Sequence, residues 1–523
     1  MDKKILTKSD IQSFRQCSRK IWIEKRRPEL IPARDSSLRR RAMDGELVQR
    51  KAQELLGSHQ IRSPDNYDPI AEARATLTTI MEMSSVPILE AAMFREPVYA
   101  RADALIPNAD SYVLSETKAK TFPLKSDKLT PKEPDEHLLD DVAIQAWVAQ
   151  GQGFKLSRLE LNLLNSQWTY PGSGDYSGLF RQLDVTAAAL ARAPEVGQWA
   201  HDALRTISGE MPELETGRHC DDPHPCALLS FCEQFDKPGP EHPIELLPDS
   251  AGKGLARKLK EKKGYSSILE PSPDELVGAQ SVLYKRMQAA HRDGRAIKES
   301  ACVELLTSLP YPRYYFDFEG IDLPVPRWSG IRPYEQIPFQ WSCHIENSAG
   351  QFTHSEFLDL SGDDPSLACI KALISVIDPS NLGPIFVYYA TYERGRLEGL
   401  RDRHPEFAAQ LEGYVTRLVD LHPLVKSNFY DPRMKGSFSI KKVLPVIAPD
   451  LDYSLLEEVA EGTGAQNAYL FAALHESTSK ERRNELASKL RKYCAMDTWA
   501  MVEVAYFLAG LPRPNSPAKL PIA

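Results

Sequence analysis

The spacing of apolar and polar residues changes along the chain and predicts strands and helices in separate stretches. Residues 313–320 (Arg-Tyr-Tyr-Phe-Asp-Phe-Glu-Gly) are mainly aromatic and apolar, which is typical of a β-strand. Residues 337–345 and 352–357 predict further strands of the same sheet. Residues 488–508 have the spacing of a helix. The second half of the chain is therefore expected to form an α/β domain.

The first part of the chain predicts a second α/β region. Strand patterns cover residues 87–94, 97–106, 112–118 and 156–163. Helical patterns cover residues 6–22, 38–56 and 140–147. Between the two regions, residues 236–300 are first rich in proline, then basic, then polar and helical. We expect a linker with a small helical connector there.

Two carboxylates, Asp317 and Glu319, end the strand predicted at 313–320. Residues i and i+2 of a strand point to the same face, so both carboxylates are expected in one place. Two close negative charges repel unless a cation neutralises them, and Mg²⁺ or Mn²⁺ prefers oxygen ligands. The alternative is an edge strand with a solvated acidic face. In the predicted helix, Tyr493 and Asp497 are four residues apart and share one helical face.

A strand Asp-x-Glu followed much later by a helical Tyr-x-x-x-Asp resembles the DnaQ-like (DEDD) 3′–5′ exonucleases of the tyrosine subtype. That family has a further acidic motif between these two. Residues 385–393 (Ile-Phe-Val-Tyr-Tyr-Ala-Thr-Tyr-Glu) stand in the right order, with Glu393 in place of the usual Asp, and Asp420 is the other choice. The resemblance implies two metal ions about 4 Å apart. It assigns metal binding to Asp317, Glu319 and Asp497, and orientation of the attacking water to Tyr493.

A second group of charged residues lies on the strands predicted in the first region. Asp103 ends one strand, and Glu116 and Lys118 share a face of the next. Two carboxylates can bind a metal, while a lysine can position water and stabilise developing phosphate charge. The alternative is a hairpin with mixed surface charges. A predicted helix containing Gln145 follows.

This order resembles the RecB-type PD-(D/E)XK nucleases, in which a helical Gln follows the Glu-x-Lys strand. The resemblance implies that Asp103 and Glu116 bind a metal and that Lys118 and Gln145 complete the catalytic set. Many of these nucleases have a metal-binding His on an early helix, where this chain has Gln49 in Gly-Glu-Leu-Val-Gln. Glu90 is the residue that could compensate.

The eight cysteines are unevenly distributed. Cys220, Cys226 and Cys232 are clustered, and Cys17 lies far upstream, whereas the other four are expected to be reduced core thiols. Four thiolates are enough for a tetrahedral Zn²⁺ site or a [4Fe–4S] cluster. One N-terminal Cys plus three after the nuclease core resembles the iron–sulfur RecB-like nucleases of the AddB-like and CRISPR-adaptation types. That resemblance favours the iron–sulfur cluster, with zinc as the alternative.

Composition adds limits on location and partners. No apolar run approaches the roughly 20 residues that a membrane span needs. The first ten residues lack the apolar segment of a signal peptide, so we expect a cytoplasmic protein without a membrane partner. The net charge of −8 does not favour nucleic-acid binding by the chain as a whole, although residues 253–263 form a basic cluster.

The whole chain resembles a bacterial family in which a RecB-like nuclease is fused to a DnaQ-like domain, the latter known as domain of unknown function 2779. The residues that carry this resemblance are 316–320, 333–340, 436–445, 493–498 and the clustered cysteines. It implies an α/β PD-(D/E)XK domain at 1–235 and an RNase H-like domain at 301–523.

The expected function is metal-dependent, exonucleolytic hydrolysis of DNA with Mg²⁺ or Mn²⁺, in repair or in defence against foreign DNA. The alternatives are a scaffold that binds nucleic-acid ends with one or both sites inactive, and a ribonuclease.

Overall fold

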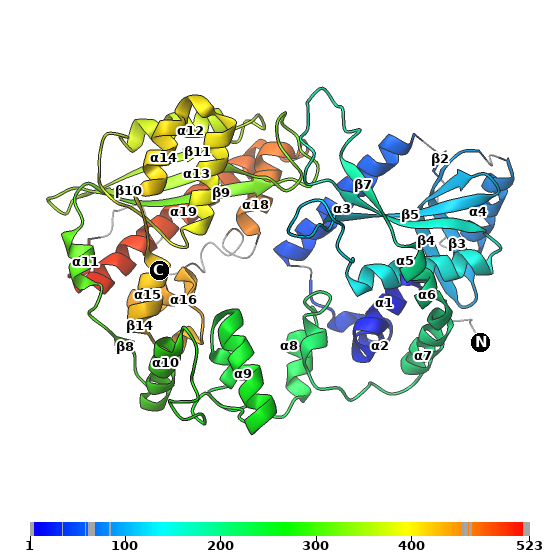
Figure 1. The fold of residues 1–523 in the computed structure, drawn as a ribbon, viewed down its shortest axis with the longest axis horizontal. Helices are drawn as coiled ribbons and strands as arrows, with labels where there is room; N and C mark the ends of the chain where they lie inside the picture. The colour runs from blue at the N-terminus through cyan, green and yellow to red at the C-terminus, as the bar shows by residue number, and fades with distance from the viewer. Residues whose placement is uncertain are drawn as a thin grey trace. The chain divides into compact units, whose positions relative to one another are not determined.

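The computed structural model describes residues 5–33, 35–57, 59–60, 68–82, 85–451, 453, 459 and 463–515. The chain divides into two compact units with mixed α/β structure (Figure 1). The first unit contains Met1–Lys237 and Leu323–Glu335, and the second contains Pro238–Asp322 and Gln336–Ala523. Most of the segment predicted as a connector, 236–300, therefore packs as part of the second unit.

Among the described residues, the first unit contains one seven-stranded sheet. Its main path runs through β2 (His59–Gln60), β3 (Ile88–Arg95), β4 (Val98–Asn108), β5 (Ser111–Thr121), β6 (Leu156–Leu164) and β7 (Phe180–Asp184). A seventh strand, β1 (Leu6–Thr7), pairs with β4. Strands β3, β4 and β5 are antiparallel, whereas β6 is parallel to β5 because helix α5 (Glu136–Gly151) crosses between them.

Helix α5 is buried along most of its length and supplies Val142, Ala143 and Ala146 to the core of the first unit. The other helices of this unit are α1 (Lys8–Gln16), α2 (Ser18–Arg26), α3 (Ser36–Leu56), α4 (Pro69–Glu82), α6 (Thr186–Arg192), α7 (Val196–Ser208) and α8 (Leu229–Cys232).

The single helix predicted at 6–22 is wrong, because the chain breaks into α1 and α2 at Cys17. Thr7 caps α1, and its hydroxyl accepts a hydrogen bond from the Asp10 N–H at 3.2 Å. Cys17 has an extended backbone, with φ −162° and ψ 125°. The break gives Cys17 a position between two helices, where its neighbours differ from those of a residue inside a helix.

The segment Leu323–Glu335 enters the first unit through backbone and side-chain contacts. The Tyr170 N–H donates to the Ile331 carbonyl at 2.9 Å, and the Tyr334 hydroxyl donates to the Ala119 carbonyl at 2.8 Å. Val325 joins a small buried cluster with Val48, Leu164 and Leu179. These contacts explain why this segment is grouped with the first unit.

Within the described residues, the second unit is built on a five-stranded sheet. Its order is β11 (Phe352–Leu358), β10 (Gln336–Glu346), β9 (Arg313–Asp322), β12 (Ile385–Val387) and β13 (Leu418–Asp420). Strand β10 is antiparallel to both β9 and β11, while β12 is parallel to β9 and β13 is parallel to β12. A two-stranded pair joins β8 (Ile297–Lys298) to β14 (Phe429–Tyr430).

Helices cover both faces of this sheet (Figure 1). On one face, α12 (Ser366–Val376), α13 (Thr391–Arg403) and α14 (Ala408–Thr416) enclose a core with Phe316 and Phe318. On the other face lies the long helix α19 (Lys480–Ala509). Because strand residues alternate between faces, burying Phe316 and Phe318 on one side directs Asp317 and Glu319 to the α19 side.

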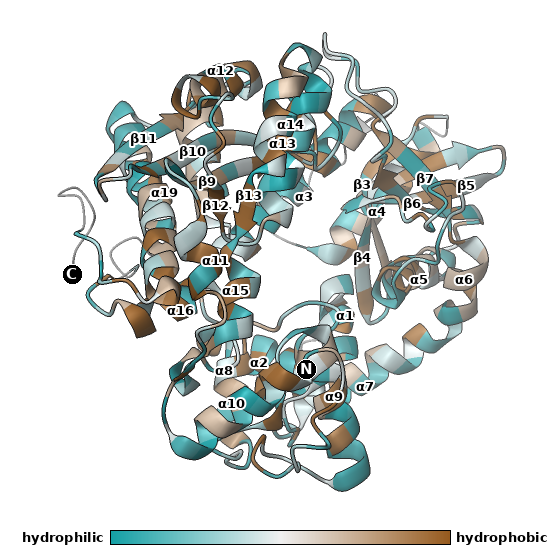
Figure 2. Cartoon of the chain, turned by 60° about the vertical axis from the view of Figure 1, so that its left-hand side comes forward, coloured by the Kyte–Doolittle hydropathy of each residue, from teal (hydrophilic) through white to brown (hydrophobic). Residues whose placement is uncertain are grey.

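The remaining described helices of the second unit are α9 (Asp249–Lys263), α10 (Ser281–Asp293), α11 (Val303–Ser308), α15 (Leu421–Asn428), α16 (Ile440–Ile447) and α18 (Gly464–Tyr469). Most helices mix hydrophilic and hydrophobic residues along their length, as expected when one side packs on a sheet (Figure 2). No helix in the described ranges combines the length and apolar character needed to cross a membrane.

Gly436 offers a test of the packing in the second unit. It has φ +77°, and an added Cβ would lie 2.2 Å from the Leu246 carbonyl oxygen. We expect Gly436→Ala to lower the free energy of unfolding by at least about 1–3 kcal/mol, because strain and a backbone clash combine. Gly413→Ala in α14 is the matched control, since an added Cβ there meets no atom within 4 Å. Equal denaturant midpoints for both variants would contradict this packing.

Candidate active sites and cysteine cluster

Three carboxylates of the second unit converge between β9 and α19. Asp317 and Glu319 come from β9 and Asp497 from α19, and one ligand atom from each lies within 4.8 Å of the others. Asp497 is buried, while Asp317 and Glu319 are half-buried. All three predicted acidic residues therefore lie in one group. The spacing of their oxygen atoms and their charge suit a divalent cation.

Burial and mutual repulsion disfavour the charged forms of these groups. Burial raises the pKa of Glu319 to about 8, and the nearby Asp497 adds to the rise. Burial also raises the pKa of Asp317 well above its usual value, with further contributions from Asp497 and Glu319. Protons or cations must therefore neutralise this site at neutral pH.

Two tyrosines flank Asp497. The Tyr453 hydroxyl donates to Asp497 Oδ1 at 2.6 Å, and Tyr493 lies one helical turn before Asp497 on α19. Burial raises the pKa of Asp497, and hydrogen bonds from Tyr453 and Tyr493 oppose that rise. Burial and the nearby Asp497 raise the pKa of Tyr493 well above its usual value, so its phenol stays protonated. Lys441 Nζ lies 5.1 Å from the Tyr493 ring centre.

Glu393 and Asp420, the two choices for the middle acidic residue, have different surroundings. Glu393 lies in the first turn of α13 and is 2% exposed. Burial raises its pKa to about 8. Its Oε2 is buried and meets no hydrogen-bond partner among the described residues. Glu393 also contributes to the raised pKa of Asp317, so the two groups are close, although Glu393 is outside the three-carboxylate group.

Asp420 is engaged with the backbone. It accepts hydrogen bonds from the N–H groups of Tyr389 at 2.9 Å, Ala390 at 3.0 Å and His422 at 3.0 Å. These contacts fix the turn before α13 and the start of α15. The geometry therefore gives Asp420 a positioning role and leaves Glu393 as the closer acidic neighbour of Asp317.

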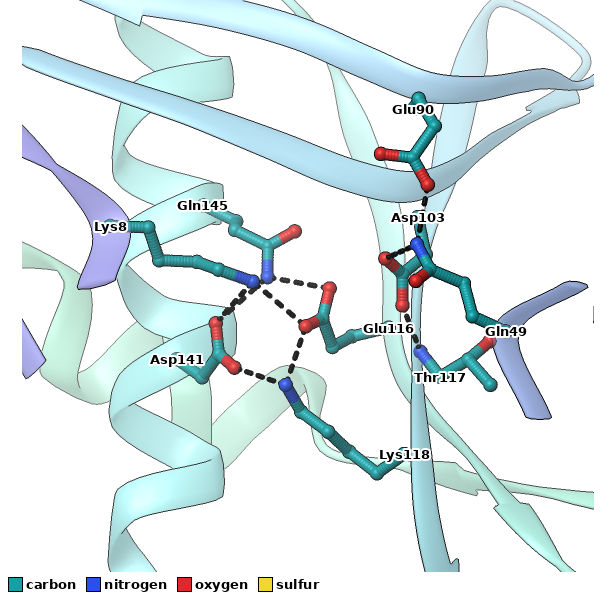
Figure 3. Close-up of polar contacts among 9 residues, drawn as sticks. All are labelled: Lys8, Gln49, Glu90, Asp103, Glu116, Thr117, Lys118, Asp141 and Gln145. Carbon is teal, nitrogen blue, oxygen red and sulfur yellow. Dashed lines mark hydrogen bonds and ion pairs between the residues drawn. The ribbon is translucent and has the colours of Figure 1, made fainter. Parts of the chain in front are cut away.

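In the first unit, β5 and α5 bring charged groups into a compact network (Figure 3). Lys118 Nζ lies 2.7 Å from Glu116 Oε1 and 2.5 Å from Asp141 Oδ2. Gln145 Nε2 donates to Glu116 Oε2 at 2.8 Å. A second lysine, Lys8 from α1, lies 2.8 Å from both Glu116 and Asp141. Glu116 thus contacts both Lys118 and Gln145, the other two predicted residues of this network.

Asp103 lies beside this network and is held by amides (Figure 3). It accepts hydrogen bonds from the Thr117 N–H at 2.7 Å and from Gln49 Nε2 at 3.0 Å. The same Gln49 amide donates to Glu90, which also accepts from Gln53 at 2.9 Å. Burial raises the pKa of Asp103 to about 8, with Glu116 adding to the rise. Gln49 thus bridges Glu90 and Asp103.

The sequence interpretation missed Lys8 and Asp141. Burial lowers the pKa of the Lys8 ammonium, but the charges of Asp141 and Glu116 outweigh burial and raise it. Asp141 precedes Gln145 by four residues on α5, so helical spacing could have identified it. Lys8 has no local signal, because its role depends on the packing of α1.

All four predicted cysteines of the cluster line a single small cavity of about 10 Å³. Cys17 lies between α1 and α2, Cys220 ends a 3-10 helix, Cys226 lies in a loop and Cys232 ends α8. No disulfide joins them, and all eight cysteines of the chain are free. Burial raises the pKa of the Cys17 thiol, and Cys232 and Cys220 add to this rise.

The donor set of this cavity fits a metal centre. Four sulfur donors from distant segments line it, which is the donor chemistry of a Zn²⁺ site or an iron–sulfur cluster, and no three of these sulfur atoms lie within 4.8 Å of one another. The Gln16 amide next to Cys17 donates to the carbonyls of His219 at 3.1 Å and His224 at 2.8 Å. These hydrogen bonds join the N-terminal helices to the loop that carries the other cysteines.

Comparison with known proteins gives a partial family match. The model for a domain of unknown function (DUF2779) matches residues 314–439, which include Asp317, Glu319 and Glu393 but end before Asp497. An uncharacterized protein of Ureaplasma parvum is 25% identical over 230 residues, 40% of this chain and 33% of that protein. An uncharacterized protein of Mycoplasma genitalium is 25% identical over 220 residues, 39% of this chain and 33% of that protein. The match spans about a third of the length of both relatives.

The cysteine cavity leads to a test of metal content. We expect Cys17→Ser and Cys220→Ser to lose most of the bound iron or zinc, because each removes one of four sulfur donors. Elemental analysis and visible absorption of anaerobically purified protein measure this loss and distinguish iron from zinc. Cys302→Ser, a buried cysteine of the second unit, is the control and should keep the full metal content. Unchanged metal in all three variants would contradict a cluster at this cavity.

Proposed function

We propose that the protein is a metal-dependent nuclease that hydrolyses phosphodiester bonds of DNA, exonucleolytically, in repair or in defence against foreign DNA. The observation that carries this proposal is the approach of Asp317, Glu319 and Asp497 within 4.8 Å, with Tyr493 one turn from Asp497. Oxygen ligands at this spacing suit Mg²⁺ or Mn²⁺, the cations used by two-metal nucleases.

In this proposal, Asp317, Glu319 and Asp497 would hold the cations, which would supply Lewis acidity and neutralise charge on the phosphate. Tyr453 fixes the orientation of Asp497 through its hydrogen bond. The Tyr493 phenol remains protonated and donates to Asp497, while its oxygen would accept a hydrogen bond from the attacking water and so orient it. Lys441, beside Tyr493, supplies positive charge near the phosphate.

The fold assignment is part of the proposal. The central strand β9 has the antiparallel strand β10 on one side, with β11 antiparallel to β10 beyond it, and the parallel strands β12 and β13 on the other side. This order supports an RNase H-like, DnaQ-type domain. The match to DUF2779, at residues 314–439, covers the same five strands.

For the first unit, we propose a RecB-like PD-(D/E)XK nuclease site stapled by an iron–sulfur cluster. Asp103 and Glu116 would hold a metal, Lys118 would stabilise phosphate charge, and Gln145 would orient Glu116. The cluster of Cys17, Cys220, Cys226 and Cys232 would join both ends of the unit.

The network of the first unit also favours a second candidate function, an end-binding scaffold in which this site does not turn over. The Lys8 and Lys118 ammonium groups already neutralise Glu116 and Asp141, while the Gln49 amide bridges Asp103 and Glu90. A site neutralised by its own lysines has less need of a cation. An RNA substrate remains the third candidate, because the RNase H-like fold serves both nucleic acids.

A nuclease assay tests these proposals directly. We expect Asp317→Asn and Glu116→Gln each to reduce a different cleavage activity by about 100-fold or more, because each removes a charged ligand of the proposed cations. End-labelled single- and double-stranded DNA and RNA with Mg²⁺ or Mn²⁺ are the substrates. Asp363→Asn, an exposed acidic residue of the second unit, is the control. If both active-site variants keep full activity, the nuclease assignment is wrong. If the wild-type protein binds nucleic-acid ends but does not cleave them, the scaffold function is favoured.

The raised pKa values predict how stability depends on pH. Burial raises the pKa of Glu319 and Glu393 to about 8, well above the usual value of about 4.3. A carboxyl with a higher pKa in the folded state stabilises the fold while protonated, and this contribution is lost as pH rises through that pKa. We therefore expect the metal-free protein to lose thermal stability towards about pH 8.

Cations that replace these protons should stabilise the protein more as pH rises, because the site binds metal in its charged form. Thermal unfolding with chelator or Mn²⁺ across this pH range measures the difference. Glu319→Gln should reduce the pH-dependent Mn²⁺ shift, whereas Glu304→Gln, an exposed residue of α11, should retain it. An unchanged shift in Glu319→Gln would contradict cation binding at this site.

A further inference from the structure

The second unit contains a hollow of about 630 Å³ that the catalytic arrangement leaves without a role. Three segments form its walls: the turn at Tyr388 and Tyr389, the loop 435–440, and the residues 245–249 with Lys253 of α9. Gly436 permits this arrangement, because a side chain there would collide with the Leu246 backbone. The shape of the hollow therefore depends on close packing of the loop 435–440 against residues 245–249.

Tyr389 has an unusual conformation at the edge of this hollow. Its side chain is 58% exposed, and its backbone has φ +83°, which residues other than glycine rarely adopt. Such a conformation costs on the order of 1–3 kcal/mol. The Asp420 carboxylate maintains it by accepting hydrogen bonds from the Tyr389 and Ala390 N–H groups. The ring rests against His422, with ring centres 4.9 Å apart.

A tyrosine at this position is not explained by core packing. A glycine would adopt the same backbone without strain, and an exposed ring buries little apolar area. The fold instead presents one flat aromatic face beside Tyr388, His422 and Phe438, which line the same hollow. Local strain of this kind is typical of binding sites, where the surrounding structure over-determines a side-chain position.

The charges of the hollow favour an anionic ligand. Glu245 pairs with Lys260 at 2.8 Å, and Asp249 pairs with Lys426, so both acidic side chains of the hollow are neutralised. In the described part of the chain, no carboxylate forms an ion pair with Lys253 or Lys435, the two lysines that line it. An aromatic platform with two available ammonium groups suits a nucleotide, which combines a flat base with a phosphate.

The hollow adjoins the carboxylate site through the chain itself. Ile440 lines the hollow, and the next residue, Lys441, has its Nζ 5.1 Å from the Tyr493 ring centre. Tyr389 lies four residues before Glu393, the acidic neighbour of Asp317. The hollow and the carboxylate site are therefore built partly from the same two segments of the chain.

We propose that Tyr389 is a stacking platform for an unpaired base of a single-stranded nucleic-acid end, with Lys253 and Lys435 contacting the adjoining phosphates. This inference rests on the proposed nuclease function of the second unit and adds a substrate class to it. A base inside a duplex has both faces covered by its neighbours, whereas an unpaired base offers a free face to the tyrosine ring. The site thus selects single-stranded ends over blunt duplexes.

Tyr389→Gly separates stacking from a structural role. Glycine removes the ring and relieves the left-handed backbone, so we expect thermal stability to stay the same or rise. We expect affinity for a labelled oligodeoxythymidine to fall by about 10- to 100-fold, the loss of one stacked base. Binding is measured with Ca²⁺ in place of Mg²⁺. Affinity for a blunt duplex should change little.

Two further variants complete the design. Tyr389→Phe keeps the ring face and should bind the oligonucleotide within about threefold of wild type, since stacking does not need the hydroxyl. Tyr311→Ala removes another exposed aromatic ring, at the opposite end of β9 from the carboxylates, and should bind as wild type. Two outcomes overturn the inference. One is an unchanged oligonucleotide affinity in Tyr389→Gly, and the other is a loss of affinity in Tyr389→Phe as large as that in Tyr389→Gly.

The same experiment distinguishes this inference from the underlying function. If wild type cleaves single strands and Tyr389→Gly does so with an unchanged KM, only the stacking role is wrong. If wild type neither binds nor cleaves any nucleic acid, the proposed nuclease function fails as well. Thymidine monophosphate serves as a competitor, and tighter binding of this free nucleotide than of the oligonucleotide overturns the assignment to a chain end.

Discussion

The repulsion among Asp317, Glu319 and Asp497 is the constraint around which the second unit is arranged. Three carboxylates within 4.8 Å are unfavourable together. Burial raises the pKa of all three, and repulsion from Asp497 adds to the rise for Asp317 and Glu319. The sheet core holds two of them in place, because Phe316 and Phe318 pack against α12–α14 and direct the carboxylates to the other face. The buried helix α19 brings the third. Cations or protons neutralise the charge that this packing concentrates.

The first unit handles a similar concentration of carboxylates in another way. Its Glu116 and Asp141 contact two lysine ammonium groups, and Asp103 accepts two amide hydrogen bonds. Removing one partner would leave a buried charge uncompensated, which is costly. Lys8 lies on α1, nine residues before Cys17. The same N-terminal segment therefore supplies one cysteine of the cavity and one lysine of the charged network. Folding of the N-terminal helices and order in the charged network are therefore linked.

Local patterns in the sequence identified the residues that short-range geometry brings together. Strand alternation placed Asp317 with Glu319, and cysteine spacing placed Cys220, Cys226 and Cys232 in one cavity. Lys8 and Tyr453 were missed, because their contacts with Glu116 and Asp497 depend on tertiary packing across more than 40 residues. The expected helix across Cys17 failed because a helical pattern does not reveal where an extended residue interrupts it.

Asp420 shows why an acidic residue near a site need not bind metal there. Its two oxygens already accept three backbone hydrogen bonds, from Tyr389, Ala390 and His422. Those bonds hold the strained turn at Tyr389, whose side chain is exposed. Helix α13 follows this turn and carries Glu393 in its first turn. One carboxylate thus fixes both the exposed Tyr389 ring and the start of the helix that carries the buried Glu393. In this arrangement, the strain at Tyr389 and the position of Glu393 have a common physical cause.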